Sequence, residues 1–276
     1  MSFTWRLTQN DTVDITFYNG NDVNVVIPDE IDGRAVEHIS SHAFKSTIES
    51  IVLPSTLKSV EYGAFAGCTA LKSIKNYPVS RVFDVRFFDD LTALEELTLA
   101  ENDKYIVSDG AVYTRNMKTL VYCFKGIVGK SYTLPREVED ISFRAFYHTQ
   151  SLEHIEVEEG NKCFKSVDGV LFSANGKMLE RYPAGKRDKS YDIPRGVVKV
   201  RFLAFHDVST LEKIYIPNTV KVLDRAVLGD CHSLTIYAEA TRRLKYWDEH
   251  WNELRKRGIG FTGEHQRVEW HCKKTD

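Results

Sequence analysis

Short apolar phrases alternate with polar residues along the chain and return at a fixed interval. The phrases IESIVLP, LKSIKNY and LEELTLA open at Ile48, Leu71 and Leu94, at equal steps of about 23 residues, a period typical of stacked repeats. Three later phrases of the same kind open at Leu152, Leu211 and Leu234. Strict alternation over four to eight residues is typical of a half-buried strand. The pattern therefore predicts a row of short strands, one in each repeat unit.

Two further signals recur in the same frame. A proline follows the strand phrase five times, at Pro28, Pro54, Pro135, Pro194 and Pro217. An Ala-Phe pair follows later in four units, at 43–44, 64–65, 145–146 and 204–205. Proline has no backbone N–H to donate, so it fits the end of a strand better than its middle. We expect each unit to turn at the proline and to pack its Ala-Phe pair between neighbouring coils.

The interval is longer in two places, from Leu94 to Gly129 and from Leu152 to Asp188. Each gap is one repeat plus an inserted segment, at 108–120 and at 167–179, that reads as two short strands joined by a turn. Asn175-Gly176 is a strong two-residue hairpin signal. At an offset of 59, positions 101–152 match positions 160–211 at 17 of 52 places. We therefore predict a tandem duplication that carries two β-hairpin insertions.

A unit of about 23 residues holds too little apolar surface to fold alone, so its copies must stack. We predict a β-rich leucine-rich-repeat solenoid with a parallel sheet on its concave face, about nine rungs, two β-hairpin insertions and a C-terminal cap. The chain, 1–276, is expected to form a single domain. Its parts would be an N-terminal cap over 1–24, repeats over 25–238 and a C-terminal cap over 239–276.

Several longer motifs resemble the BspA-like leucine-rich repeats. They are IPDEIDGRAVEHISSHAF at 27–44, LPSTLKSVEYGAFAGCTALKSI at 53–74, DGVLF at 168–172 and YPAGK at 182–186. The resemblance covers nearly all of the chain from about Asn19 onward. It implies a curved solenoid without known catalytic residues that binds proteins or other macromolecules, often at bacterial surfaces. The start of this chain shows no signal peptide, so the cytoplasm is the default expectation, although the family is often secreted or surface-exposed.

The repeat pattern stops after Tyr237. Apolar residues then fall at helical steps of three and four, at Ala240, Leu244, Trp247, Trp251 and Leu254. We expect an amphipathic helix over 239–257, ended by Gly258, whose apolar stripe covers the open end of the solenoid. The segment 247–251 resembles a Trp-Asp-x-x-Trp stretch of the family, which can be a loop in relatives. A last strand is expected at 268–270.

Side chains of a strand alternate between the two faces of its sheet, so every second residue should face outward. The outward positions form a ladder of candidate binding residues: Val52, Lys75, Thr98, Thr133, Glu156, Asp192 and Tyr215. Nine rungs spaced at about 4.8 Å give a surface about 40 Å long, which is enough for a protein interface. Tyr215 is the strongest single candidate, because aromatic residues are enriched at binding hot spots. Carbohydrate binding on the same sheet is the alternative, although it favours several aromatic residues in a row. The two inserted hairpins form a second candidate surface.

Composition narrows the class of partner. The 37 Lys and Arg against 39 Asp and Glu give a net charge of −2, which argues against non-specific binding to nucleic acid. No apolar run reaches the roughly 20 residues of a membrane span. Five cysteines, an odd number without a C-x-x-C pair, favour reduced thiols. We expect an unidentified protein partner and leave the oligomeric state open.

Candidate chemistry is sparse. Gly258–Gly263 spells G-x-G-x-x-G, but a dinucleotide site needs a strand before the motif and a helix after it. His250, His265, His271 and Cys272 carry zinc-binding groups without the paired short spacings of a zinc site. Cys68 and Cys231 hold the same repeat position, where a small core residue explains both. We therefore predict no enzyme activity, no catalytic residue, no metal and no cofactor.

Overall fold

The computed structural model describes residues 2–79, 83–88, 90–124, 129–229, 231, 234–256 and 260–272, without the side chains of 253–256 and 260–265. The chain forms two compact units, Met1–Ile127 and Val128–Asp276, and each is described by itself. The single domain expected from the sequence stays a prediction.

Unit 1 is built from short strands and one 3-10 helix. They are β1 (Phe3–Leu7), β2 (Val13–Tyr18), β3 (Asn24–Val26), β4 (Glu30–Ile31), β5 (Arg34–Ile39), β6 (Ser50–Val52), β7 (Ser59–Val60), β8 (Ser73–Tyr77), η1 (Val85–Phe88), β9 (Glu96–Leu99), β10 (Tyr105–Ser108), β11 (Ala111–Thr114) and β12 (Thr119–Cys123).

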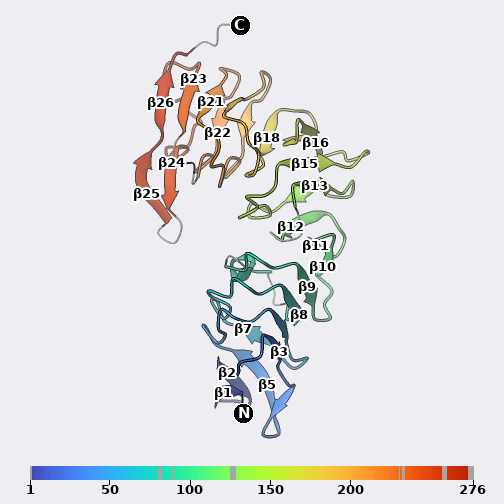
Figure 1. Cartoon of the computed structure of the whole chain (residues 1–276). Helices are drawn as coiled ribbons and strands as arrows, with labels where there is room; N and C mark the ends of the chain where they lie inside the picture. The colour runs from blue at the N-terminus through green and yellow to red at the C-terminus, as the bar shows by residue number, and fades with distance from the viewer. Residues whose placement is uncertain are drawn as a thin grey trace. The chain divides into compact units, whose positions relative to one another are not determined.

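Two rows of parallel strands run through unit 1 (Figure 1). The first row has the order β3-β6-β8-β9, and the second pairs β2 with β5 and β5 with β7. In the first row Val25, Ile51, Ile74 and Leu97 are neighbours in register, and each is at most 3% exposed. Every coil thus contributes one apolar side chain to a continuous column in the core. The segment β10-β11-β12 is antiparallel instead.

Unit 2 follows the same plan. Its strands are β13 (Ser131–Leu134), β14 (Asp140–Ile141), β15 (His154–Val157), β16 (Phe164–Val167), β17 (Val170–Ser173), β18 (Met178–Arg181), β19 (Ser190–Asp192), β20 (Lys199–Val200), β21 (Lys213–Ile216), β22 (Val222–Leu223), β23 (Thr235–Ala238), β24 (Glu253–Lys256), β25 (Gly260–His265) and β26 (Arg267–Trp270).

The sheet β19-β21-β23-β26 of unit 2 is parallel throughout, and β13 pairs with β15 in a separate parallel pair (Figure 1). Ile214 lies between Tyr191 and Ile236 in register, and Val268 follows on β26. A second parallel row joins β18, β20 and β22. Strand β17 pairs antiparallel with β16 on one side and with β18 on the other. The last strand expected at 268–270 is confirmed as β26.

The predicted solenoid of about nine turns with parallel sheets is confirmed. All five predicted prolines come within two residues after a strand of the parallel sheets. The Ala-Phe pairs are buried, and none of their eight residues exceeds 4% exposure. Cys68 and Cys231 are buried core residues whose thiols donate to backbone carbonyls, of Lys45 at 3.4 Å and of Phe205 at 3.0 Å. Burial raises the pKa of the Cys68 thiol to about 11, so it stays protonated at neutral pH.

The prediction of a helix over 239–257 is wrong. The described part of this segment consists of turns followed by β24, and no α-helix occurs in the described residues. Its backbone bonds to the preceding coil: Asp248 donates to the Leu223 carbonyl, and Ala226 donates to the His250 carbonyl. Trp247 and Trp251 are each 2% exposed and pack edge to face at 5.1 Å. The spacing of apolar residues therefore marks tryptophans that are buried on turns. The segment is not helical because its backbone bonds to a neighbouring coil instead of forming the i to i−4 bonds of a helix.

Two turns of unit 2 that are equivalent in the tandem duplication pack directly against each other. Tyr147 stacks on His206 at 4.4 Å, and Nδ1 of His148 lies 3.4 Å from Oδ2 of Asp207. Nδ1 of His206 approaches the same oxygen at 3.3 Å. Burial alone would raise the pKa of Asp207, but the hydrogen bonds from His148 and His206 outweigh it and hold this pKa well below its usual value. Asp207 therefore joins the two turns as a carboxylate.

We expect Asp207→Asn to lower the free energy of unfolding by about 2 kcal/mol at pH 7, because the carboxylate is the shared acceptor of both turns. A depressed pKa stabilises the fold above the ordinary aspartate pKa of about 3.9 and loses this effect as the pH falls. The difference between wild type and variant should thus shrink by about 1 kcal/mol between pH 5 and pH 3. Urea unfolding at both pH values measures it, and a difference that does not change with pH contradicts the assignment.

Candidate binding surface

The seven residues predicted to face outward all lie on strands of the parallel sheets, and none of them is buried. The exposed ones are Lys75, Thr98, Thr133, Glu156 and Asp192, and the half-buried ones are Val52 and Tyr215. In register they form three neighbouring pairs: Val52 with Lys75, Thr133 with Glu156, and Asp192 with Tyr215. Thr98 follows a register shift between β8 and β9, so it has no direct neighbour among the seven. Their role in binding stays a prediction.

The outward side chains of unit 1 are mostly polar groups that bond to one another across the rungs. Ser50 Oγ donates to Asn24 Oδ1 at 2.7 Å, and Ser73 Oγ donates to Glu96 Oε2 at 2.6 Å. The bond from Ser73 and the nearby charge of Lys75 lower the pKa of the Glu96 carboxyl group. Because these groups already satisfy each other, a partner gains little from contacting them.

The sheet β19-β21-β23-β26 of unit 2 presents a different surface. Tyr215 and Tyr237 are neighbours on β21 and β23, and their rings stack with centroids 4.9 Å apart and an interplanar angle of 16°. Asp192 precedes the pair in register, and Glu269 follows it. Along this row the two tyrosines thus lie between two acidic residues, Asp192 and Glu269. Both tyrosines are half-buried, so part of each ring remains open to solvent.

A cavity of about 190 Å³ opens beside the tyrosine pair, where β19 and β21 end. Its lining includes both tyrosines together with Pro194 and Pro217. At its rim the Arg195 guanidinium pairs with the Glu239 carboxylate, and Glu239 Oε2 also accepts a bond from the Asn218 backbone N–H at 2.9 Å. This arrangement combines rigid apolar walls with a fixed polar edge, which is the composition of a small recognition pocket.

Tyr237 is the surface residue that the sequence frame missed. Val52, Lys75 and Thr98 each lie four residues after the first residue of their phrase, and the same step from Leu234 leads to Ala238. The structure pairs Ile214 with Ile236 and Tyr215 with Tyr237, a step of 22 instead of 23. The local alternation of Ile236 and Ala238, both buried, was the signal that could have found Tyr237, because it marks the residue between them as outward.

The alternatives drawn from short motifs gain no support. Part of G-x-G-x-x-G lies outside the described residues, and its remainder falls in β25, which pairs antiparallel with β24 and does not open a helix. The zinc set includes His265, whose side chain is also outside the description. Among the described residues, no group of three or more His, Cys, Asp or Glu is placed to hold a metal ion. No helix in the described part of the chain has the length and apolar character needed to cross a membrane.

A comparison of the sequence with models of protein families identifies the family of this chain. The model of the BspA type leucine rich repeat region matches six copies, over residues 13–123, 118–180 and 185–248. The chain belongs to the BspA-type leucine-rich repeat family. The last matched range includes β19, β21 and β23, so the surface around Tyr215 and Tyr237 is part of the repeat region.

Several solved structures are similar to this chain at low identity. A leucine rich cell surface protein from Faecalibacterium prausnitzii shares 18% identity over 89% of this chain and 76% of that chain, with a TM-score of 0.46. A leucine-rich repeat protein from Bacteroides ovatus shares 20% identity over 86% and 70%, with a TM-score of 0.43. The pneumococcal vaccine antigen PcpA shares 19% identity over 86% and 79%, with a TM-score of 0.41. A comparison with curated proteins found none that matches.

Proposed function

We propose that this repeat protein is a non-catalytic scaffold that binds another protein through the outward side chains of its parallel sheets. The tyrosine pair on β21 and β23 would lie at the centre of the contact in unit 2. The observation that supports this most is the stacking of Tyr215 on Tyr237 beside a cavity lined by Pro194 and Pro217. In a solenoid the outward position needs no aromatic residue for folding, so two in succession favour recognition.

The physical basis is a low entropic cost of binding. A tyrosine has few rotatable bonds, and stacking at 4.9 Å restrains each ring before a partner arrives. Aromatic residues that combine an apolar face with a hydroxyl group dominate binding energy in many interfaces. The flanking Asp192 and Glu269 carboxylates add specificity at the ends of the row more than affinity.

Replacing both tyrosines tests the proposal. We expect Tyr215→Ser with Tyr237→Ser to weaken capture of a protein partner by about tenfold or more, because each ring would bury apolar area in the contact. The readout is quantitative mass spectrometry of proteins captured from the native host, followed by affinity measurement with each purified candidate.

Tyr62→Ser is the matched control, since Tyr62 is 61% exposed and lies off the parallel sheets. Circular dichroism and thermal melting confirm that all variants fold. Partners that bind the double variant as well as they bind the control would show that the tyrosine pair is not the binding surface.

Carbohydrate binding is the second candidate function, and Tyr237 is the observation that favours it. A row of aromatic residues is what a glycan site on this sheet requires, and the structure supplies two instead of one. Against it, the rings stack on each other, so each ring covers a face that a sugar would use. A glycan array probed with the wild type and the double variant separates the two: binding lost only in the variant would favour a glycan.

We also propose that the chain carries no catalytic activity at this surface. Cys272 lines the cavity and carries a potential nucleophile, but no histidine is among the described residues that line it. A cysteine nucleophile normally requires a neighbouring base. The ionic groups of the rim, Arg195 and Glu239, are bound to each other.

A further inference from the structure

Strand β1 lies at the edge of its sheet, so one side of its backbone faces away from the sheet. The sheet has the order β1-β2-β5-β4, and β1 pairs antiparallel with β2 (Figure 1). Among the described residues no strand pairs with the other side of β1. An edge of this kind presents a row of N–H and C=O groups to which a further strand can bond.

The hydrogen bonds around β1 identify the groups on its open side. The Asn19 N–H donates to the Ser2 carbonyl at 2.7 Å, and the Thr8 N–H donates to the Thr12 carbonyl at 2.9 Å. In an antiparallel pair every second residue bonds to the partner strand, and the residues between them point away from it. The extra residue of the β-bulge lies on β2, so β1 keeps this alternation. Three residues of β1 therefore turn their N–H and C=O groups to the open side: Phe3, Trp5 and Leu7.

The residues opposite them on β2 agree with this direction. Tyr18 lies opposite Phe3, and its N–H donates to the Ala43 carbonyl at 2.7 Å. Ile15 lies opposite Trp5, and its carbonyl accepts a bond at 2.9 Å from the backbone that follows β5. Both groups thus bond on the side of β2 that faces away from β1, and neither satisfies a group of β1.

The open side of β1 lacks two features that commonly protect sheet edges from pairing, proline and unpaired charge. The strand contains no proline. Its one charged side chain is paired, because Arg6 Nε donates to Asp14 Oδ2 at 2.8 Å. Leu7 is 48% exposed, whereas Phe3 and Trp5 are half-buried and pack against the core. The edge therefore combines open backbone groups with apolar side chains on one face.

The strand is complementary to a second copy of itself. Its apolar residues are placed symmetrically, with Phe3 and Leu7 at equal distances from Trp5. If two copies lie antiparallel with the two Trp5 residues opposite each other, Phe3 of each copy lies opposite Leu7 of the other. In this register the open residues of one copy face the open residues of the other, so every open N–H and C=O group gains a partner. Arg6 then faces Thr4 of the other copy, and no like charges are opposed.

We infer that β1 is a pairing edge whose partner is β1 of a second copy of this chain, antiparallel and related by a two-fold axis at Trp5. Two-fold dimers with self-complementary contacts are the commonest assemblies of identical chains. The cross-strand contact of Phe3 with Leu7 adds apolar burial to the backbone bonds. Because the contact is small, we expect a weak dimer that depends on concentration. It lies in unit 1 and does not depend on the function proposed for the tyrosine pair.

Analytical ultracentrifugation of the full chain over a wide range of concentrations tests the inference, because it measures the monomer–dimer equilibrium. We expect Leu7→Pro to weaken the dimer by about tenfold or more, since proline removes one donor from each copy. The Leu7 N–H points away from β2, so the variant loses no bond within the chain and is expected to fold. Thermal melting checks this.

Val26→Pro is the matched control for Leu7→Pro. Val26 is 66% exposed on β3, which ends a different sheet of unit 1. The next N–H along β3, that of Ile27, is the one that donates to the neighbouring coil, at the Val52 carbonyl. Proline at position 26 therefore makes the same change at another edge, and the dimer should be unaffected. A chain that stays monomeric at every concentration, or a dimer that Leu7→Pro leaves intact, overturns the inference.

Cysteine crosslinking tests the register. Trp5→Cys should form a disulfide between copies under mild oxidation, because residues directly opposite in a hydrogen-bonded pair lie about 5.5 Å apart at Cα. Thr4→Cys should not, since the two substituted residues would be displaced along the strands by two positions. The wild type, with its five cysteines, sets the background for both. Crosslinking of Thr4→Cys as readily as of Trp5→Cys overturns the pairing about Trp5.

Discussion

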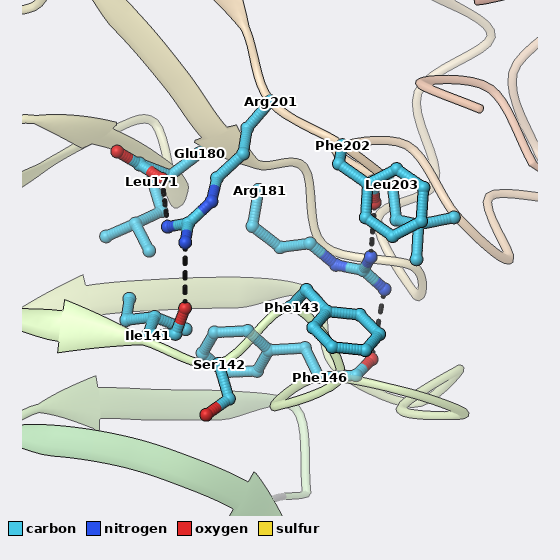
Figure 2. Close-up of a pocket in the computed structure, with 10 residues that line it drawn as sticks. All are labelled: Ile141, Ser142, Phe143, Phe146, Leu171, Glu180, Arg181, Arg201, Phe202 and Leu203. Carbon is cyan, nitrogen blue, oxygen red and sulfur yellow. Dashed lines mark hydrogen bonds and ion pairs between the residues drawn. The ribbon is translucent and has the colours of Figure 1, made fainter. Parts of the chain in front are cut away.

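Replacing Arg181 by methionine is expected to destabilise unit 2 by about 3 to 5 kcal/mol. Arg181 is 6% exposed, and its guanidinium donates to the carbonyls of Leu203 at 2.6 Å, Phe146 at 3.0 Å and His206 at 3.1 Å. Figure 2 shows the first two of these bonds. Methionine fills a similar volume but removes all three bonds, and the carbonyls of Phe146 and Leu203 then keep only the donors Thr149 Oγ1 and the His206 backbone N–H. Urea unfolding followed by tryptophan fluorescence measures the change, and three of the four tryptophans lie in unit 2.

The reason for this arginine lies in the segment between the two turns that it joins. The turns at 142–149 and 201–208 meet beside the coil that contains β18, and Arg181 is the last residue of that strand. This coil has no Ala-Phe turn of its own. The guanidinium supplies the donors that a turn would have supplied. Burial lowers the pKa of Arg181 to about 10, so it remains charged at neutral pH.

Arg187→Met is the matched control for Arg181. The Arg187 side chain is 79% exposed and lies 3.4 Å from Glu153, so we expect a change below about 0.5 kcal/mol. Arg181→Tyr adds a second comparison, because Tyr122 holds the equivalent position in the first tandem copy. If Arg181→Met unfolds at the same urea concentration as wild type, the arginine does not hold the two turns together.

Adding one methyl group at Gly185 is expected to be nearly as damaging, at about 3 kcal/mol. A Cβ atom there would lie 2.5 Å from the Gln150 carbonyl oxygen and 2.8 Å from the Leu152 backbone nitrogen. The Gly185 N–H also donates to the Leu152 carbonyl at 2.8 Å. Both contacts are with backbone atoms of a neighbouring coil, which no side-chain rotation can relieve, so the coils would have to separate.

The steric effect of a Cβ atom at Gly185 can be separated from the cost of replacing a glycine elsewhere in the chain. Gly67 has a positive φ of 76°, but a Cβ there would meet nothing within 4 Å. Gly67→Ala should therefore cost only about 1 kcal/mol, from the left-handed backbone alone. Thermal melting of both variants makes the comparison. Equal melting temperatures for the two alanine variants would rule out close packing of coils as the role of Gly185.

The sequence by itself determined the repeat. Stacked coils of equal length bury the same side chain again and again, so a periodic core leaves a periodic sequence. Alternation along three strands predicts six inward residues: Leu97, Leu99, Ile155, Val157, Ile214 and Ile216. Four of them are buried, whereas Leu99 and Val157, at the ends of their strands, are half-buried. The same periodicity placed the strands, the prolines that follow them and the Ala-Phe pairs.

Only the tertiary structure decided the features that depend on contact between coils. The spacing of Trp247 and Trp251 fits a helix as well as it fits turns, and hydrogen bonds to the preceding coil selected the turns. Tyr237 joined Tyr215 because one rung is a residue shorter than the repeat, and register is set by pairing with a neighbour. Arg181 and Asp207 acquired their roles where two turns that are distant in the sequence pack together. Periodicity records what every coil shares, whereas the surface and the polar contacts arise where one coil departs from the others.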